Sequence, residues 1–194
     1  MISIVIPTFN DSEFFLEVLS ALEKQTYSDI EIIVVDSSTE HDSSKVINES
    51  LQGSFLETTY KKIDRAYAGK SMNEGLKMVK GNLVGFLDTK TIPEIDWLEK
   101  YLRHINEGYS VVFGVTKYKE ITNFQKILKA ASYGEIGHQT VPGTVIKREA
   151  VNSIGTFIEN IRAAYDQEWR ERVMDKLKFY VPDQPSITLS LIHI

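Results

Sequence analysis

Two aspartates stand directly after runs of apolar residues, where a carboxylate is well placed for ligand chemistry. Asp36 follows the run Ile30 to Val35, and Asp88 follows the run Leu83 to Leu87. Continuous apolar runs of this length are typical of strands that are buried on both faces of a sheet. In an open α/β sheet, ligands bind just beyond the carboxyl ends of the strands. We therefore expect both carboxylates at one sheet edge, where their oxygens can accept hydrogen bonds from a ligand.

Alternating strands and helices position these carboxylates in the first half of the chain. Apolar residues predict strands at residues 2–6, 30–35, 55–60 and 83–87, and helical spacing predicts helices that end near residue 25 and that span about 42–51 and 69–79. This alternation implies right-handed parallel crossovers, with helices packed on the sheet. We predict an α/β fold whose Rossmann-like, mostly parallel central sheet is covered by helices on both faces.

The residues after Pro93 predict an elaboration of the same sheet. Helices are expected at about 96–106, 122–132 and 164–177, and strands at 109–115 and 144–147. The end, SITLSLIHI, is either an edge strand that closes the domain or a point before further sequence. No linker rich in Gly, Pro or Ser and no internal repeat divides the chain, so we predict one domain over residues 1–194.

Composition excludes several classes of protein. The 194 residues are 42% hydrophobic and 25% charged, which is ordinary for a globular protein. A net charge of -5 argues against nucleic acid as a partner. The chain has no cysteine, so disulfides and Cys-based zinc sites are excluded. The opening ISIVIP is too short for a signal-peptide core, and no apolar run reaches the roughly 20 residues of a membrane span, so we expect a cytosolic protein without an integral membrane segment.

Four segments resemble, in order and spacing, the family 2 nucleotide-sugar glycosyltransferases of GT-A fold. They are ISIVIPTFN, EIIVVDSSTEHDS, GKSMNEGLKMVKGNLVGFLDTKTIP and RAAYDQEWRER, and the resemblance covers about residues 1 to 175. It implies an enzyme that transfers a sugar, with inversion, from a nucleotide-diphospho-sugar such as a UDP or GDP sugar to a hydroxyl of a carbohydrate or lipid-linked acceptor. The donor half would span about residues 1–95 and the acceptor half about 96–194. Such enzymes commonly build cell-surface polysaccharide, in the cytosol or at the inner membrane face.

The resemblance also implies a set of donor-binding residues. Pro7, Thr8 and Asn10 would line the nucleotide pocket, and Asp36 would bind the base or the ribose. Arg65, Lys70 and Asn73 fall where the family has its donor-contacting loop and the following helix, with Gly69 allowing close backbone approach. Alternative interpretations remain open: Asp36 is a turn aspartate, and Arg65 and Lys70 are solvated surface cations.

The residues after the strand 83–87 depart from the family pattern. The family ends this strand in Asp-x-Asp, whose last carboxylate and the donor diphosphate hold Mg²⁺ or Mn²⁺, whereas this chain has Asp88, Thr89 and Lys90. Three interpretations follow. A metal ion binds through Asp88 and the diphosphate, with help from a residue such as His193. Lys90 itself neutralises the departing diphosphate. Or the protein is a degenerate member without activity.

The resemblance places the catalytic base at Asp166. In the family an acidic pair precedes the long helix, and its aspartate deprotonates the acceptor hydroxyl; here Tyr165 replaces the first acid of the pair. The alternative is that Asp166 is an aspartate at a helix N-terminus, stabilised by the helix dipole. Trp169 is expected in the core or as an acceptor platform.

Two other functions are weighed against a transferase. A non-catalytic nucleotide-sugar binding domain is suggested by Lys90 and Tyr165, and it predicts donor binding without turnover. A nucleotidyltransferase that makes the sugar nucleotide has a related fold, but it needs a glycine-rich, basic loop after the first strand. The segment PTFNDSE has neither glycine nor a basic residue.

Overall fold

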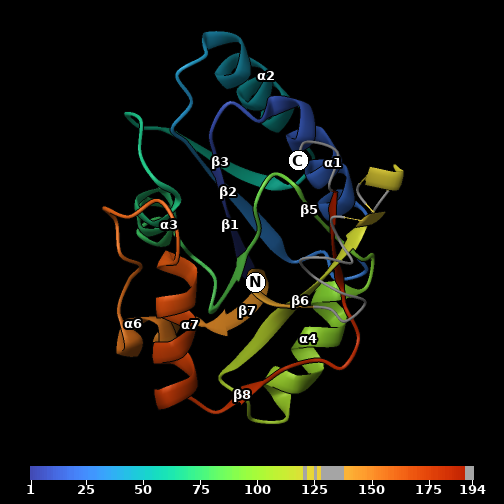
Figure 1. The fold of residues 1–194 in the computed structure, drawn as a ribbon, viewed down its shortest axis with the longest axis vertical. Coiled ribbons are helices and arrows are strands. Elements are labelled where there is room, and N and C mark those ends of the chain that lie inside the picture. The colour runs from blue at the N-terminus through green and yellow to red at the C-terminus, as the bar shows by residue number, and fades with distance from the viewer. Residues whose placement is uncertain (120–121, 125, 128–137, 191–194) are drawn as a thin grey trace.

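The computed structural model describes residues 1–119, 122–124, 126–127 and 138–190. Within these ranges nine strands form one sheet in the order β3-β2-β1-β4-β7-β6-β9-β5, with β8 paired to β6 beside this path. Helices cover both faces of the sheet (Figure 1). Strands from both the predicted donor half and the predicted acceptor half join the same sheet, and β4 and β7 pair where the two halves meet.

The first half of the sheet is parallel, as the sequence predicts. Its strands are β1 (Ile2–Thr8), β2 (Ile30–Asp36), β3 (Glu57–Lys62) and β4 (Leu83–Phe86), connected through α1 (Ser12–Glu23), α2 (His41–Gln52) and α3 (Ala68–Leu76). Thr8 of β1 lies opposite Asp36 of β2, and Asp36 lies opposite Lys62 of β3. The carboxyl ends of these strands therefore meet at one edge, which we call the carboxyl edge.

The second half adds antiparallel pairs. Its elements are β5 (Thr91–Pro93), α4 (Trp97–Asn106), β6 (Val111–Lys119), β7 (His138–Lys147), α6 (Arg148–Ile154), α7 (Tyr165–Lys176), β8 (Phe179–Tyr180) and β9 (Ile187–Ser190). β7 runs antiparallel to β4 and β6, and β9 runs parallel to β6 and antiparallel to β5. The sheet is mixed, with a parallel first half, and none of the helices among the described residues is long and apolar enough to cross a bilayer.

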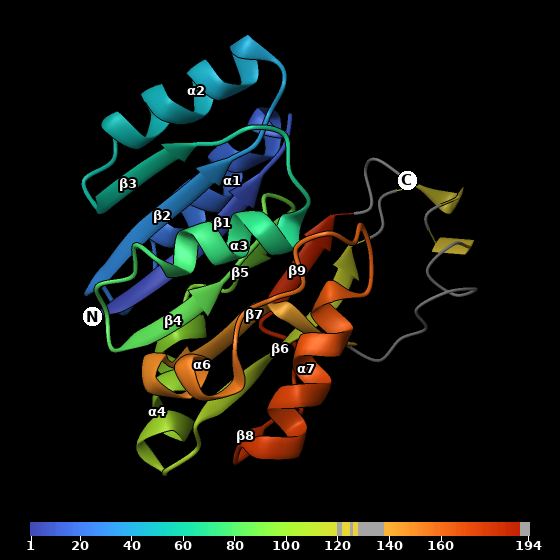
Figure 2. The same ribbon diagram turned by 90° about the vertical axis from the view of Figure 1, so that its left-hand side faces the viewer.

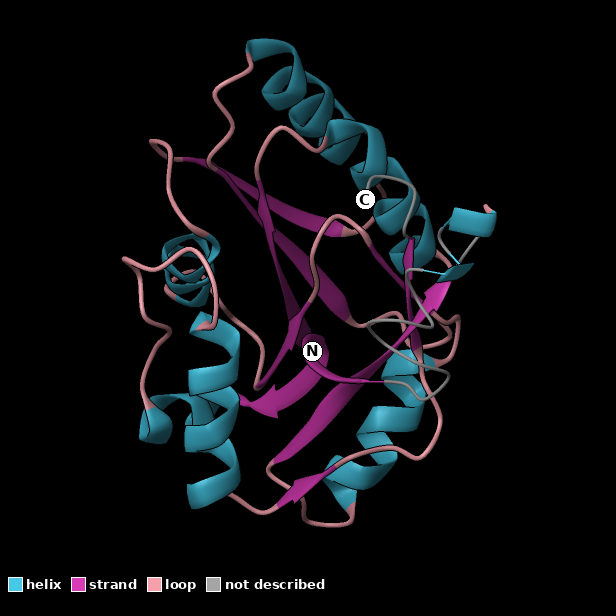
Figure 3. Cartoon of the chain, viewed as in Figure 1, coloured by secondary structure: helices cyan, strands magenta, loops and turns pink. Residues whose placement is uncertain are grey.

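Two apolar cores explain why the strands read as continuous runs. Alternate residues of β1 face opposite cores, since Ile4 packs with α1, α2 and α4, whereas Val5 packs with α3, α6 and α7. In Figure 2, α3, α6 and α7 lie in front of the sheet, and Figure 3 shows helices on either side of it. Both faces need apolar side chains, which removes the polar alternation of a half-exposed strand.

Several predicted boundaries differ from the structure. The strand expected at 55–60 is β3, and Phe55 lies outside it with 76% of its surface exposed. The strand expected at 144–147 is only the buried end of β7, which begins at His138. The C-terminal strand β9 is internal rather than an edge, because it pairs with both β6 and β5. The helix expected at 122–132 lies largely outside the described residues.

Candidate functional site

A cavity of about 210 Å³ opens at the carboxyl edge, between the ends of β1 and β4. We call it the central cavity. The loop after β1, the end of β2, the start of α3, the loop after β4 and the first residue of α7 all contribute to its wall. Its lining residues are Pro7, Thr8, Phe9, Asp11, Ser37, Ala66, Ala68, Ser71, Asp88, Thr89, Lys90 and Tyr165. Segments that are far apart in the sequence therefore converge where ligands bind in open α/β sheets.

Asp88 lies in the wall of the central cavity, as predicted. Its Oδ1 atom accepts a hydrogen bond of 2.9 Å from the backbone N–H of Lys90, and its own N–H donates to the Thr91 hydroxyl at 3.1 Å. The Thr91 side chain also lies close enough to hydrogen-bond the carboxylate, and this contact opposes the effect of burial on its pKa. Burial raises the pKa of Asp88 above its ordinary value, against the opposing effect of the Lys90 N–H. The loop after β4 thus fixes the carboxylate through the Lys90 N–H and the Thr91 side chain.

The side chain of Lys90 is held in the cavity by the loop after β1. Its ammonium lies 3.2 Å from Oδ1 of Asp11 and 5.3 Å from the centre of the Phe14 ring. The ion pair and the cation–π contact both fix the position of a positive charge. Lys90 is 41% exposed and Asp11 is 25% exposed, so the ammonium is still accessible from the cavity.

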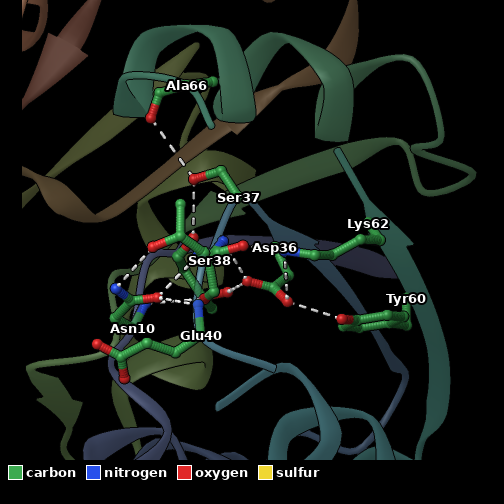
Figure 4. A network of polar contacts seen from close by, with 10 residues as sticks. Asn10, Asp36, Ser37, Ser38, Glu40, Tyr60, Lys62 and Ala66 are labelled. Atoms are coloured by element: carbon green, nitrogen blue, oxygen red, sulfur yellow. Dashed lines mark hydrogen bonds and ion pairs between the residues drawn. The ribbon is translucent and has the colours of Figure 1, made fainter. Parts of the chain in front are cut away.

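Asp36 is fully buried beside the central cavity, and its oxygens are occupied (Figure 4). Oδ1 accepts hydrogen bonds from the Thr8 hydroxyl at 3.1 Å and from the Ser38 N–H at 2.8 Å. Oδ2 accepts from the Tyr60 hydroxyl at 2.7 Å and lies 3.5 Å from the Lys62 ammonium. In this conformation Asp36 ties β1, β2 and β3 together at the carboxyl edge, a structural role like the one considered for a turn aspartate. A direct contact of Asp36 with the base or the ribose remains a prediction.

The network around Asp36 changes the acidity of two side chains. Burial by itself raises the pKa of Asp36, but hydrogen bonds from Ser38 and Tyr60 outweigh it and lower the pKa to about 2. Burial, together with the bond to the Asp36 carboxylate, raises the pKa of Tyr60 to about 12. Asp36 is therefore ionised at neutral pH, and Tyr60 stays a hydrogen-bond donor.

Asn10 joins the loop after β1 to the loop after β2. Its Oδ1 atom accepts hydrogen bonds from the N–H groups of Thr39 at 2.9 Å and Glu40 at 3.1 Å, just before α2 begins. Its own N–H donates to the Ser38 hydroxyl at 2.8 Å. The backbone of Asn10 is left-handed, with φ 54°, a conformation that asparagine adopts more readily than most residues. Asn10 fixes the loops after β1 and β2, whereas Pro7 and Thr8 line the central cavity itself.

Asn73 contacts protein rather than the cavity. Its side chain donates hydrogen bonds of 2.9 Å to the Phe157 carbonyl and to Glu159, and it accepts one of 2.9 Å from the Phe157 N–H. The amide is 3% exposed. These contacts use the side-chain amide to hold the segment after α6 against α3, and Asn73 does not line the central cavity, so its contact with a donor remains a prediction. The close backbone approach at Gly69 is likewise made by the chain, because a Cβ there would lie 2.1 Å from the Ile158 carbonyl.

Arg65 and Lys70 are exposed and lie beside the central cavity. Both line a neighbouring hollow that also includes Ser38 and Thr39. The Arg65 guanidinium lies 5.6 Å from the centre of the Phe9 ring. The loop after β2 contributes to both. Ser37 lines the central cavity, and Ser38 lines the neighbouring hollow.

The start of α7 closes the central cavity on the side opposite β1. Tyr165 lines the cavity, and Asp166, the next residue, is partly exposed in the first turn of the helix. Burial, followed by the charges of Asp166 and Asp88, raises the pKa of Tyr165. Asp166 and Asp88 thus both lie near the Tyr165 phenol, and the role of Asp166 as the base remains a prediction. Trp169 is fully buried against Phe86, which confirms the core position.

The residues after β4 do not fit a cation held by two carboxylates. The second acid of the family motif is replaced by an ammonium, and that ammonium is paired with Asp11. In the part of the chain that the structure describes, no group of three or more His, Asp or Glu side chains is arranged to hold a metal ion. His193, the helper ligand considered from the sequence, lies outside the described residues.

The comparison with known proteins decides the family. A sequence profile described as Glycosyl transferase family 2 matches residues 3–172. The chain belongs to this family. The match covers all four segments that carry the resemblance, so that prediction is confirmed.

A relative within family 2 is the GalNAc(5)-diNAcBac-PP-undecaprenol beta-1,3-glucosyltransferase of Campylobacter jejuni. It is 29% identical over 131 residues, which cover 64% of this chain and 41% of that protein. The chain therefore spans less than half the length of this relative.

Two solved structures are similar to this family 2 chain. S. aureus TarS 1-349 in complex with UDP-GlcNAc matches with a TM-score of 0.77 and 19% identity, over 97% of this chain and 58% of that one. The mannosyltransferase PcManGT from Pyrobaculum calidifontis, in complex with GDP-Man and Mn²⁺, matches with a TM-score of 0.73 and 20% identity, over 97% of this chain and 56% of that one. The likeness confirms the predicted GT-A type of α/β fold.

Eight of the twelve residues that line the central cavity were not predicted from the sequence as site residues, and three of these bear on its chemistry. Phe9 and Asp11 follow β1, and Tyr165 begins α7. Asp11 reads as a helix-capping residue, and only the fold shows that it faces Lys90. Tyr165 was noticed in the sequence because it stands where the resemblance implies an acid. That substitution indicated the loss of a carboxylate and gave no sign that the tyrosine lines the cavity.

Proposed function

We propose that this chain binds a nucleotide-diphospho-sugar and transfers its sugar, with inversion, to an acceptor hydroxyl. The observation that carries the proposal is the convergence of Asp88, Lys90 and the start of α7 on one cavity at the carboxyl edge. A leaving diphosphate needs positive charge, and an attacking hydroxyl needs a base on the opposite side of the anomeric carbon. Lys90 supplies the positive charge for the diphosphate, and Asp166 supplies the base for the hydroxyl.

Donor binding follows from the two adjoining hollows. The nucleoside lies against the loops after β1 and β2, which Asn10 and Asp36 hold in place. Arg65 and Lys70 provide positive charge along the rim. The diphosphate enters the central cavity toward Lys90, where a fixed ammonium stabilises the departing charge. Residues 1–95 therefore act as the donor half of one domain.

Lys90 takes over part of the task that a divalent cation has in related enzymes. Its ammonium is fixed by Asp11 and Phe14, so little rearrangement is needed when charge develops on the leaving group. Asp88 lines the same cavity and, through its raised pKa, binds a proton more readily than a free aspartate. We propose that binding of the diphosphate does not require Mg²⁺ or Mn²⁺ in this chain.

Asp166 is the proposed base, and residues 96–194 form the acceptor half. The carboxylate lies in the first turn of α7, and the part of the chain that the structure describes gives it no hydrogen bond or ion pair. The Campylobacter relative is named for a substrate linked to PP-undecaprenol, which supports a lipid-linked acceptor. We propose such an acceptor, with the protein working in the cytosol or at the inner membrane face.

Calorimetric titration of UDP and of GDP tests the proposal, with and without Mn²⁺, in the unmodified protein and in Lys90→Asp. We expect one nucleotide to bind without Mn²⁺, and binding to Lys90→Asp to become dependent on Mn²⁺. Lys100→Asp is the matched control. Lys100 lies on α4, outside the residues that line the cavity, and pairs with Asp96, which precedes that helix. Absence of binding by either nucleotide, under any condition, would overturn the donor site.

Turnover separates a transferase from a binding domain. The transferase predicts release of free nucleotide from the donor when water replaces the acceptor. Nucleotide binding with no release, in the presence of a lipid-linked acceptor as well, would support the non-catalytic alternative.

A further inference from the structure

We propose that Tyr165 binds the transferred sugar by donating a hydrogen bond from its phenolic hydroxyl to a sugar oxygen. This inference rests on the proposed function and adds a sugar-binding residue to it. The family pattern that the sequence resembles has an acid at this position, so this contact departs from that pattern.

The ring of Tyr165 is fixed by aromatic packing. It meets the Phe157 ring edge-on, with 6.1 Å between the ring centres and an interplanar angle of 69°. Phe157 in turn stacks on Trp169 at 4.8 Å, inside the core beneath α7. A side chain whose position is set by packing presents its polar end in a defined direction.

The hydroxyl of Tyr165 has no hydrogen-bond partner in the part of the chain that the structure describes. Tyrosine hydroxyls that are buried normally find a partner. Tyr165 lines the central cavity and its hydroxyl keeps some exposure to solvent, so a ligand in the cavity can take the place of water as its partner. Burial, followed by the charges of Asp166 and Asp88, raises the pKa of Tyr165, so the phenol is protonated at neutral pH and can donate.

The position of Tyr165 selects the sugar rather than the nucleotide. The diphosphate lies at Lys90, and the attacking hydroxyl lies at Asp166, so the anomeric carbon must lie between them. Tyr165 is adjacent to Asp166 in the chain and shares the cavity wall with Lys90. The nucleoside lies farther off, toward Arg65 and Ser38, which line the other hollow.

The chemistry of the contact differs from that of the family. A carboxylate accepts hydrogen bonds from sugar hydroxyls, whereas a protonated phenol donates one to a ring, hydroxyl or N-acetyl oxygen. The substitution also removes a negative charge that would lie near the Asp88 carboxylate, whose charge acts on the Tyr165 phenol. Lys90 and Tyr165 are thus two departures from the family that line the same cavity.

The test compares binding of nucleotide sugars with binding of the bare nucleotides. UDP-glucose, UDP-galactose, UDP-GlcNAc and GDP-mannose are titrated beside UDP and GDP into the unmodified protein and into Tyr165→Phe, which keeps the ring and its packing. We expect the advantage of the preferred sugar nucleotide over its bare nucleotide to fall about fivefold in Tyr165→Phe, with binding of the bare nucleotide unchanged. Tyr27→Phe is the matched control, because Tyr27 donates to Asp29 just before β2, at the opposite sheet edge.

The outcomes separate this inference from the proposed function. If that advantage is the same in Tyr165→Phe as in the unmodified protein for all four sugars, the sugar contact is overturned while the donor site stands. Equal weakening of UDP and UDP sugars would assign Tyr165 to the diphosphate or to the fold, and it would overturn the contact as well. If no nucleotide binds to the unmodified protein, the donor site itself falls, and the inference falls with it.

Discussion

The Lys90 ammonium lies 3.2 Å from Oδ1 of Asp11, and this pair joins the loop after β4 to the loop after β1 across the mouth of the central cavity. The cation is held in advance of any ligand, but its charge is partly balanced by the carboxylate. A diphosphate that approaches Lys90 therefore also meets the negative charge of Asp11. Asp11 sets both the position of Lys90 and the strength of its attraction for an anion.

Asp11→Asn should tighten nucleotide binding. The amide keeps the shape of the side chain while it removes one negative charge from the cavity wall, a change worth about 1 kcal/mol at a partly exposed site, or about fivefold in affinity. Calorimetric titration with UDP and GDP measures the effect, which should diminish at high salt. Asp96→Asn is the control, because Asp96 precedes α4 as Asp11 precedes α1 and pairs with Lys100 at 2.8 Å. Weaker binding of the nucleotide by Asp11→Asn would show that Asp11 serves chiefly to position Lys90.

Asp36→Asn should destabilise the protein at neutral pH. Folding lowers the pKa of this carboxyl from 3.8 to about 2, and each pKa unit corresponds to about 1.4 kcal/mol, so ionised Asp36 contributes about 2 kcal/mol to the free energy of unfolding. The unfolded chain binds the proton more readily than the folded one. The contribution is therefore complete above about pH 4 and is lost as the pH falls toward about 2.

Urea unfolding at neutral pH and through the acid range checks the role of Asp36. We expect a loss of about 2 kcal/mol for Asp36→Asn at neutral pH and a shallower decline of stability with acid. Asp183→Asn, at an exposed position, should match the unmodified protein at every pH. An unchanged acid profile in Asp36→Asn would mean that the buried carboxylate does not stabilise the carboxyl edge.

Gly69→Ala should be far more harmful than Gly53→Ala. A Cβ at Gly69 would lie 2.1 Å from the Ile158 carbonyl oxygen, so α3 and the segment after α6 must move apart. At Gly53 the nearest atoms lie 3.6 and 3.8 Å away, which is ordinary contact. We expect a loss of about 1–3 kcal/mol for Gly69→Ala and a change within about 0.5 kcal/mol for Gly53→Ala, both measured by urea unfolding. Equal stability of the two variants would mean that the contact at Gly69 relaxes freely.

Most of the first half of the fold could be predicted from the sequence. β1, β2 and β4 are buried on both faces, so their side chains are apolar without a break, and this pattern is visible in the residues alone. The order of strands and helices then fixes parallel pairing, and parallel pairing places Asp36 and Asp88 at one edge. This chain of inference needs only local information and the rule on crossovers.

The second half was harder to predict because its strands are less uniform. The first part of β7 is partly exposed and carries Pro142 and Gly143, so only its buried end resembles a strand. α6 has only seven residues, too few to show a helical period. β9 finds its partners in β6 and β5, and that pairing depends on contacts between distant parts of the chain.

The site shows the same limit at the level of side chains. The residue types at Asn10, Asp36 and Asn73 suit a ligand, and each was predicted to contact the donor. The structure shows that the chain itself uses their polar atoms, to join loops and to hold the segment after α6. Sequence patterns indicate which residues are polar and where they lie along an element, but the partner of each polar atom depends on the folded arrangement.

Asp166→Asn should abolish turnover while leaving donor binding intact. An amide cannot take a proton from the attacking hydroxyl, and removal of a general base typically slows a reaction by about 100-fold or more. The nucleotide binds through the loops after β1, β2 and β4, so its affinity should stay within about twofold, a difference of less than 1 kcal/mol. Release of free nucleotide from the donor measures the first effect, and calorimetry measures the second.

Asp175→Asn is the matched control for the base, because Asp175 lies on the same helix at its exposed end. It should leave both turnover and binding unchanged. If Asp166 were instead an aspartate that only stabilises the start of α7, Asp166→Asn would lower the free energy of unfolding by about 0.3–1 kcal/mol and leave the rate of nucleotide release as it is. A rate that falls while stability and affinity hold is the result that only a base explains, since neither loss of the helix-dipole interaction nor a change in the donor site would produce it.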